Sequence, residues 1–272
     1  MGLKLRAFIK SSVILALFFL LCSCSGGDSS TADEVKPEPQ PIQVIKNSLV
    51  DCGDYRIEPP SSLPWKLSRP TDWVVMGSSS AFGAGASVPG NSWVGLVTST
   101  YSEQGVTVHN IAKGGYTSYH ALAGNCIVSG SRPAADPQHN IGKALEFKPD
   151  LVFLSYPSND AVSMFAATET ASNLLLLRWQ LMQQGAAVMI LSAQPRNTNA
   201  PAQAALLELD KLLRPLVGSC FVELHSLLVA GSGGLATQFD AGDGVHLNDA
   251  GHQVVAQAIN QTLNSGRCVE LL

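Results

Sequence analysis

Five short apolar runs alternate with helical patterns along this 272-residue sequence, and this alternation constrains the fold more than any other feature. The runs span residues 73–76, 106–110, 151–155, 187–192 and 220–224, and several are rich in Val and Ile. Short runs of this composition are typical of strands that are buried on both faces. The alternation therefore predicts a five-stranded parallel sheet with helices on both sides.

The order of strands and helices also predicts where the functional loops lie. The helical patterns span residues 92–103, 140–147, 168–184, 202–216 and 248–263. Crossovers between parallel strands are right-handed, and ligands bind outside the carboxyl ends of the strands. We therefore expect functional residues in the segments that follow strands, which are residues 77–80, 110–115, 156–160 and 243–246.

Asp243-Gly-Val-His246, in the long loop after the fifth predicted strand, suggests a serine esterase. A carboxylate three residues before an imidazole can orient the ring and leave its second nitrogen free to accept a serine proton. Histidine suits this role because its unperturbed pKa is about 6.5. Since this spacing also occurs by chance in loops, the interpretation depends on the motifs that accompany it.

Four blocks taken together resemble the SGNH or GDSL hydrolases. In chain order they are Gly77-Ser-Ser-Ser-Ala-Phe-Gly83, Asn110-Ile-Ala-Lys-Gly-Gly115, Ser158-Asn-Asp160 and Asp243-Gly-Val-His246, which match over about residues 70–265. Each block follows a predicted strand, so the combination is far more specific than any single block. The resemblance implies a flavodoxin-like three-layer α/β/α sandwich and an activity on carboxylic esters.

The resemblance also assigns roles to individual residues. It implies that Ser79 is the nucleophile, His246 the general base and Asp243 the group that orients the imidazole. The oxyanion hole would consist of the backbone N–H groups of Ser79 and Gly115 and the side-chain amide of Asn159. Loss of one such donor typically costs roughly 2.7–4 kcal/mol of transition-state stabilisation. Gly115 suits this role because the absence of a side chain lets its N–H approach the substrate.

Two positions depart from the family pattern. Ser78 stands where Asp is usual, and Pro157 stands where Gly is usual. Neither supplies the nucleophile or an oxyanion hydrogen, so we expect the chemistry to survive and the substrate preference and loop shape to differ. Asp160 is expected to cap the following helix. His225 and His252 are expected to have structural roles.

The leading hypothesis is a serine esterase that hydrolyses short acyl esters, such as O-acetyl groups on glycans or small lipids, through an acyl-enzyme. Tyr116 and Tyr156, beside the expected oxyanion residues, are candidates to line the substrate pocket. One alternative is an acyltransferase that passes the acyl group to a sugar hydroxyl. Another is a lipid-anchored binding protein without turnover, against which the intact Ser79, Asp243 and His246 argue.

The sequence predicts neither a cofactor nor a metal, and no nucleic-acid partner. Gly83-Ala-Gly85 lacks the third Gly of a dinucleotide loop, and no Gly-Lys-Ser/Thr motif occurs. His109, His120 and His139 have no spacing that suggests a metal site. Removal of an N-terminal signal would lower Lys plus Arg from 17 to 14 against 21 acids, changing the net charge from −4 to −7. An acidic chain without a basic cluster argues against nucleic-acid binding.

The N-terminal residues 1–23 are typical of an export signal. Three basic residues precede an apolar run over residues 13–21, which is too short to span a bilayer. The run ends in Leu21-Cys22-Ser23-Cys24, which resembles a bacterial lipobox. Cys24 is the expected lipidation site and Cys22 the alternative, while the competing interpretation is an ordinary cleaved signal peptide.

The expected product is a lipid-anchored monomer in the bacterial cell envelope. Ser25 after the lipidated cysteine favours the outer membrane, by resemblance to other lipoproteins. Residues 24–45 are polar and rich in Gly, Ser and Pro, which predicts a disordered tether. Residues 46–272 are then long and apolar enough for one catalytic domain with a single core.

Four cysteines lie outside the signal, at positions 52, 126, 220 and 268. An even number in an exported chain predicts two disulfides, and the sequence alone permits three pairings. In the predicted fold Cys220 starts a strand and Cys268 follows the last helix, at the same edge of the sheet. We therefore favour Cys220 with Cys268 and Cys52 with Cys126. A zinc site is disfavoured because no two of these cysteines are closely spaced.

Overall fold

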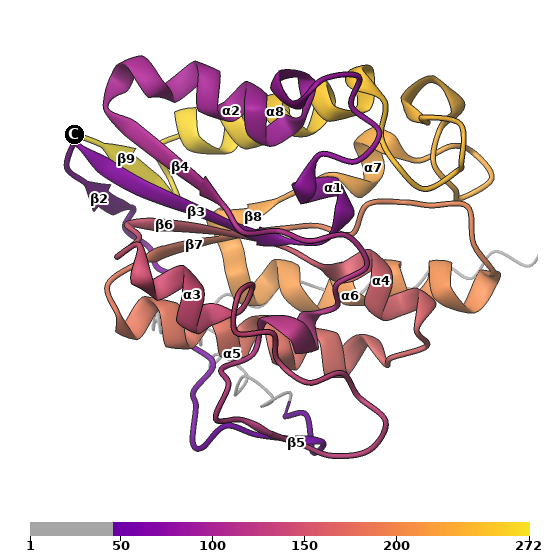
Figure 1. The fold of residues 1–272 in the computed structure, drawn as a ribbon, viewed down its shortest axis with the longest axis horizontal. Helices are drawn as coiled ribbons and strands as arrows, with labels where there is room; N and C mark the ends of the chain where they lie inside the picture. The colour runs from indigo at the N-terminus through magenta and orange to yellow at the C-terminus, as the bar shows by residue number, and fades with distance from the viewer. Residues whose placement is uncertain (1–45) are drawn as a thin grey trace, which may run out of the picture. The chain divides into compact units, whose positions relative to one another are not determined.

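A parallel sheet of five strands lies at the centre of the protein in the computed structural model, which describes residues 46–272 (Figure 1). The strands lie side by side in the order β4-β3-β6-β7-β8. In chain order they are β3 (Thr71–Gly77), β4 (Val106–Asn110), β6 (Leu151–Ser155), β7 (Ala187–Leu191) and β8 (Phe221–Val222). The chain thus enters at the second position of the sheet and reverses direction once, which is the flavodoxin-like order.

The strands are buried because helices cover both faces of the sheet. On one face α2 (Trp93–Tyr101) packs against α8 (Asp249–Asn264) (Figure 1). On the other face lie α3 (Ile141–Glu146), α5 (Ala167–Gln183) and α6 (Ala200–Val217). Both faces of the strands are therefore apolar, as in β3, where residues 73–76 are at most 1% exposed. The predicted three-layer α/β/α fold is confirmed.

The five predicted helices begin and end within two residues of the predicted positions. Four of them start at a polar N-cap whose side-chain oxygen accepts a hydrogen bond from a backbone N–H of the first turn. These N-caps are Ser92, Asn140, Asn199 and Asn248. The sequence pattern located these helices well because caps and apolar periodicity are both local signals.

Three short helices at the carboxyl edge of the sheet were not predicted. They are α1 (Ser79–Phe82), α4 (Pro157–Val162) and α7 (His225–Leu228), which follow β3, β6 and β8. These helices have four to six residues and, unlike the six-residue α3, none of them has a side-chain hydrogen bond at its N-cap, so they lack the local signals that mark a helix. Segments that the sequence pattern treats as loops are therefore partly helical, and two of them carry candidate site residues.

Two small sheets lie outside the central one, and a disulfide accompanies each. Strands β1 (Val50–Asp51) and β5 (Ile127–Val128) are antiparallel, next to the Cys52–Cys126 bond. Strands β2 (Trp65–Leu67) and β9 (Val269–Leu271) are parallel, and Cys268 bonds to Cys220. Both bonds are the pairs that the sequence favoured. Strands of two or three residues give no reliable sequence pattern, which explains why none of the four was predicted.

The predicted signal, the Cys24 lipidation site and the tether fall in residues 1–45 and lie outside the described residues. Within residues 46–272, no helix is both long enough and apolar enough to cross a membrane.

Candidate active site

Ser79 is the first residue of α1, at a sharp turn after β3. A side chain at Gly77 would place its Cβ 2.6 Å from the Ala81 Cβ and 2.7 Å from the Ser155 carbonyl oxygen, so only glycine fits. The N–H of Ser78 donates to that same carbonyl at 3.0 Å, which fixes the turn against β6. These close contacts hold Ser79 at the carboxyl end of β3, next to the point where the strand order reverses.

Asp243 and His246 form the hydrogen-bonded pair that their spacing predicts. Oδ2 of Asp243 lies 2.6 Å from Nδ1 of His246. Its other oxygen accepts the backbone N–H groups of His246, at 2.8 Å, and Val245, at 2.9 Å. The bonds from the backbone and the ring of His246 lower the pKa of Asp243 to about 2. The carboxylate is therefore charged at neutral pH and favours a proton on Nδ1, which leaves Nε2 as an acceptor.

The loop that carries this pair is fixed from two sides. Asp240 accepts the backbone N–H of Gly244, which has a φ of +72°. A side chain at Gly244 would also place its Cβ 2.5 Å from the amide nitrogen of Asn197, so space and conformation both require glycine. On the other side Asn248 caps α8 by accepting the N–H of Gly251 at 3.0 Å. His246 therefore lies in a short segment between two anchored points.

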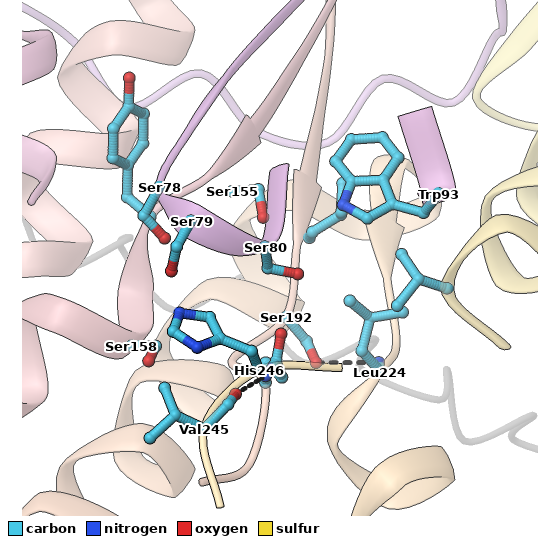
Figure 2. Close-up of a pocket in the computed structure, with 14 residues that line it drawn as sticks. Ser78, Ser79, Ser80, Trp93, Ser155, Ser158, Ser192, Leu224, Val245 and His246 are labelled. Carbon is cyan, nitrogen blue, oxygen red and sulfur yellow. Dashed lines mark hydrogen bonds between the residues drawn. The ribbon is translucent and has the colours of Figure 1, made fainter. Parts of the chain in front are cut away.

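Ser79 and His246 line the same pocket although they are 167 positions apart. Figure 2 shows the Ser79 hydroxyl directed toward the imidazole of His246, with Ser158 nearby. The cavity measures about 20 Å³, roughly the space of one water molecule, and Trp93 and Leu224 contribute to its apolar lining. Among the described residues no hydrogen bond joins Ser79 to His246. Catalytic hydrogen bonds are often long before substrate binds.

The backbone N–H groups of Ser79 and Gly115 are available as hydrogen-bond donors at the site. The loop after β4 turns where the N–H of Tyr116 donates to the carbonyl of Lys113, and Gly115 in this turn has a φ of +81°. A Cβ at the adjacent Gly114 would lie 3.9 Å from that of Ser79, so the loop runs beside the candidate nucleophile. Within residues 46–272 the N–H groups of Ser79 and Gly115 have no acceptor. The positive φ, more than crowding, explains the glycine at 115.

Asn159 lies on α4 with both ends of its amide held. Its Nδ2 donates to the carbonyl of Tyr116 at 3.0 Å, and its Oδ1 accepts from Nη1 of Arg196 at 3.3 Å. Arg196 also donates to the Ser158 hydroxyl at 3.1 Å. Arg196 is not among the residues that the sequence predicts at the site, since its only signal there is its position in the loop after β7.

The expectation that Asp160 caps a helix is wrong. Asp160 lies inside α4 and is fully buried, and the N-cap of α5 is Ala166. Its carboxyl group accepts the N–H of Ser118 at 2.9 Å, the hydroxyl of Ser118 and the hydroxyl of Thr170. Burial raises the pKa of Asp160 to about 7. The side chain of Asp160 thus points into the protein, toward the segment after β4 and toward α5.

His252 and His225 have structural partners. His252 is fully buried, accepts the N–H of Trp93 on Nδ1 at 3.2 Å, and places Nε2 3.1 Å from the Ala84 carbonyl. His225 contacts the Ala193 carbonyl at 3.3 Å. Both rings therefore bind backbone groups, which fits the expected structural roles.

The two candidate pocket tyrosines differ in position. Tyr156 is fully buried and lines the cavity beside Ser79. Tyr116 does not line that cavity: its hydroxyl donates to Asp136, and its ring stacks on His120 with centroids 4.2 Å apart. Within the described part of the chain, no group of three His, Cys, Asp or Glu side chains could hold a metal ion.

A serine, an Asp–His pair and unoccupied N–H donors at the carboxyl edge of a parallel α/β sheet define a class of hydrolases that act on acyl esters. The chain belongs to the GDSL-like lipase/acylhydrolase family, whose family model matches residues 75–254. It is therefore an ester-bond hydrolase, as its four sequence blocks indicated. No curated protein matches the sequence.

Solved structures share the fold at low sequence identity. The chain is similar to TesA, with a TM-score of 0.57, 20% identity, and coverage of 71% of this chain and 98% of TesA. It is also similar to the psychrotrophic esterase EstA from Pseudoalteromonas sp., with a TM-score of 0.52, 16% identity, and coverage of 72% and 97%. For the acetyl xylan esterase AlAXEase the TM-score is 0.53, with 17% identity and coverage of 71% and 99%.

Proposed function

We propose that this protein is a serine esterase that removes short acyl groups, such as O-acetyl groups on glycans or small lipids, through an acyl-enzyme intermediate. The observation that carries the proposal is the meeting of Ser79 and His246 in one pocket, with Asp243 2.6 Å from Nδ1 of the imidazole. This arrangement supplies a hydroxyl, an acceptor for its proton and a charged group that stabilises the resulting imidazolium.

The reaction proceeds in two halves. The Ser79 hydroxyl attacks the ester carbonyl carbon while Nε2 of His246 takes its proton, and that proton then passes to the departing alcohol. The acyl group remains on the Ser79 oxygen. Water next attacks the acyl carbonyl, gives a proton to His246 and releases the carboxylic acid as the serine regains its hydrogen. Asp243 stays ionised throughout because its pKa is about 2.

Charge that develops on the carbonyl oxygen is stabilised by three donors around Ser79. These are its own backbone N–H, the N–H of Gly115 and the remaining N–H of the Asn159 amide. The two backbone groups have no acceptor within the described residues, so they need not break a hydrogen bond to receive the oxyanion. Donors held in place before the reaction contribute most, because they require no reorganisation.

The size of the cavity supports a preference for small acyl groups. At about 20 Å³ it holds a group of roughly the size of a water molecule or a methyl group without rearrangement. A similar structure bears the name acetyl xylan esterase. We therefore propose acetyl esters as preferred substrates.

Hydrolysis of p-nitrophenyl acetate by residues 46–272 tests this function. Ser79→Ala is expected to lower kcat by roughly 10⁴-fold or more, because it removes the hydroxyl that is directed toward the imidazole of His246. Ser99→Ala, at an exposed serine on α2, is the matched control and should keep wild-type kcat. Activity should decrease from acetyl to butyryl and longer esters.

Two results would contradict the proposal. One is wild-type turnover by the Ser79→Ala protein, which would assign the nucleophile elsewhere. The other is the absence of both turnover and labelling by a fluorophosphonate that reacts with activated serines, which would favour the binding-protein hypothesis.

We also propose that the mature chain is anchored to the bacterial cell envelope through a lipid on Cys24. The lipobox-like Leu21-Cys22-Ser23-Cys24 motif carries this proposal, and the two disulfides support export to an oxidising compartment. Mass spectrometry of the mature N-terminus should find a lipid-modified Cys24. An unmodified terminus downstream of Cys24 would overturn the proposal.

A further inference from the structure

Arg196 contacts the side-chain amide of Asn159, a candidate donor to the oxyanion, and takes no part in the proposed reaction steps. It lies in the loop between β7 and α6 and is half-buried. Its Nη1 donates to the Oδ1 of Asn159 at 3.3 Å and to the Ser158 hydroxyl at 3.1 Å. Burial lowers the pKa of the guanidinium, and the nearby charge of Asp243 opposes this change. A cation therefore lies against the oxygen end of the Asn159 amide.

The contacts at the two ends of this amide determine which way it points. Oδ1 of Asn159 faces a donor, Arg196, and Nδ2 faces an acceptor, the Tyr116 carbonyl, at 3.0 Å. A flipped amide would place its NH₂ group against the guanidinium and its oxygen against the carbonyl, and both contacts would be repulsive. Only one orientation satisfies both neighbours. In that orientation one of the two Nδ2 hydrogens is used and the second remains free.

The loop that carries Arg196 is itself bonded to the loop that carries the Asp243–His246 pair. Nε2 of Gln194 donates to the Val245 carbonyl at 2.6 Å, and the backbone N–H of Asn197 donates to the Gly244 carbonyl at 2.7 Å. These bonds flank Arg196 on both sides in the sequence. They place its guanidinium at a fixed position relative to the proposed base and to Asn159.

We propose that Arg196 is a positioning residue for ester hydrolysis: it fixes the flip of the Asn159 amide and polarises it as a donor to the oxyanion. The inference rests on the proposed esterase function. A hydrogen bond from a charged donor is stronger than a neutral one and polarises the group that accepts it. The free N–H of Asn159 thereby becomes a better donor without any contact between Arg196 and the substrate.

This role predicts a specific kinetic signature. The oxyanion carries its full charge only near the transition state, so loss of the positioning contact should lower kcat and leave KM nearly unchanged. Arg196 acts through Asn159, and its removal can cost no more than removal of the amide itself. Loss of one oxyanion donor costs about 10²- to 10³-fold in kcat, so Arg196→Ala should cost roughly 10- to 100-fold.

The decisive experiment is a double-mutant cycle with p-nitrophenyl acetate, comparing Arg196→Ala, Asn159→Ala and the double variant. The double variant should be no slower than Asn159→Ala alone, because the arginine has no amide left to orient. Arg196→Lys retains the charge but loses the planar fork, so its kcat should lie between those of the wild type and Arg196→Ala. The KM of each Arg196 variant should stay within about two-fold of the wild-type value.

The inference is overturned if Arg196→Ala keeps wild-type kcat, or if its loss multiplies with that of Asn159→Ala. Thermal unfolding of every variant excludes a loss of folded protein as the cause. Arg267→Ala, at an exposed arginine beyond the far end of α8, is the matched control and should leave kcat unchanged. Failure of the esterase proposal itself gives a different result, namely a wild-type protein without ester hydrolysis.

Discussion

Gly77 illustrates how single residues determine the position of the candidate nucleophile. Its backbone lies so close to Ala81 and Ser155 that an added Cβ would approach within 2.6 and 2.7 Å of them. One of these neighbours is a backbone carbonyl of β6, which cannot move without disturbing the sheet. Glycine at this position therefore allows the close turn that places Ser79 at the carboxyl end of β3.

We predict that Gly77→Ala destabilises the protein by about 1–3 kcal/mol, the usual cost of overpacking, and lowers kcat because Ser79 shifts. Chemical denaturation and p-nitrophenyl acetate kinetics measure the two effects. Gly231→Ala is the control, since no atom lies within 4 Å of its added Cβ and its φ is not positive. Equal stability of the two variants would show that β6 tolerates the extra methyl group.

A second prediction at the residue scale concerns the charge of Asp243. Asp243→Asn keeps the size of the side chain but removes the charge that holds a proton on Nδ1 of His246. We expect kcat to fall by about 10²- to 10⁴-fold, as the imidazole adopts the wrong tautomer, with little change in stability for so exposed a side chain. The neighbouring Asp249, which is half-buried and bonded to Ser87, is unsuitable as a control because it anchors the start of α8. Wild-type kcat in Asp243→Asn would remove the carboxylate from the mechanism.

At the scale of elements, α4 connects the site to the interior. Asn159 and Asp160 are consecutive residues of this helix, and their side chains have different partners: Asn159 contacts Arg196 and the Tyr116 carbonyl, and Asp160 contacts Ser118 and Thr170. The buried carboxyl group therefore holds α4 against α5 and against the segment after β4. The position of the oxyanion amide depends on that anchor.

The raised pKa of the buried Asp160 makes the stability of the protein depend on pH. The pKa is about 7 in the folded protein and near 3.8 for an ordinary Asp, so the folded state binds the proton more tightly. Between these values the folded state carries more protons, and the free energy of unfolding decreases as pH rises. This contribution is fully present below about pH 4 and is lost as pH rises through about 7.

We predict that Asp160→Asn removes this part of the pH dependence. Urea unfolding of both proteins should be measured from pH 4.5 to pH 8. As the pH rises, the free energy of unfolding of the wild type should decrease relative to that of the variant, by a few kcal/mol at most. Asp136→Asn, at a carboxylate on the molecular surface, serves for comparison, because its pKa is lowered by hydrogen bonds and not raised. Parallel curves for wild type and Asp160→Asn would contradict the assignment.

At the scale of the whole molecule, the two disulfides connect segments that are far apart in sequence. Cys52 and Cys126 are 74 positions apart, and Cys220 and Cys268 are 48 positions apart. Both bonds lie beside the small outer sheets and neither contributes to the pocket lined by Ser79 and His246. Stability and catalysis should therefore respond separately to their removal.

We predict that replacing either cysteine pair by Ala lowers the free energy of unfolding by up to about 4 kcal/mol, because the unfolded chain gains loop entropy. Well below the unfolding temperature kcat should stay at the wild-type value. Thermal unfolding and initial rates on the same samples check both parts. A loss of kcat in fully folded protein would show that an outer sheet influences the site.

Much of the fold was accessible from local patterns. The runs at 73–76 and 151–155 are apolar on both faces because helices cover both sides of β3 and β6, and this is visible in composition alone. The Asp243–His246 pair was accessible for a similar reason, since the two side chains that bond directly are only three positions apart. By contrast, the loop expected around Asn159 is a short helix, and Asp160 turns inward instead of capping.

The sequence alone determined the order of strands and helices, the family and the residue types of the site, because each of these depends on neighbouring residues or on motif order. Only the tertiary structure decided how Arg196 meets Asn159 and how Asp160 meets Ser118. These pairs are 37 and 42 positions apart and follow different strands. Their contact depends on the packing of separate loops at one sheet edge, which no local pattern encodes.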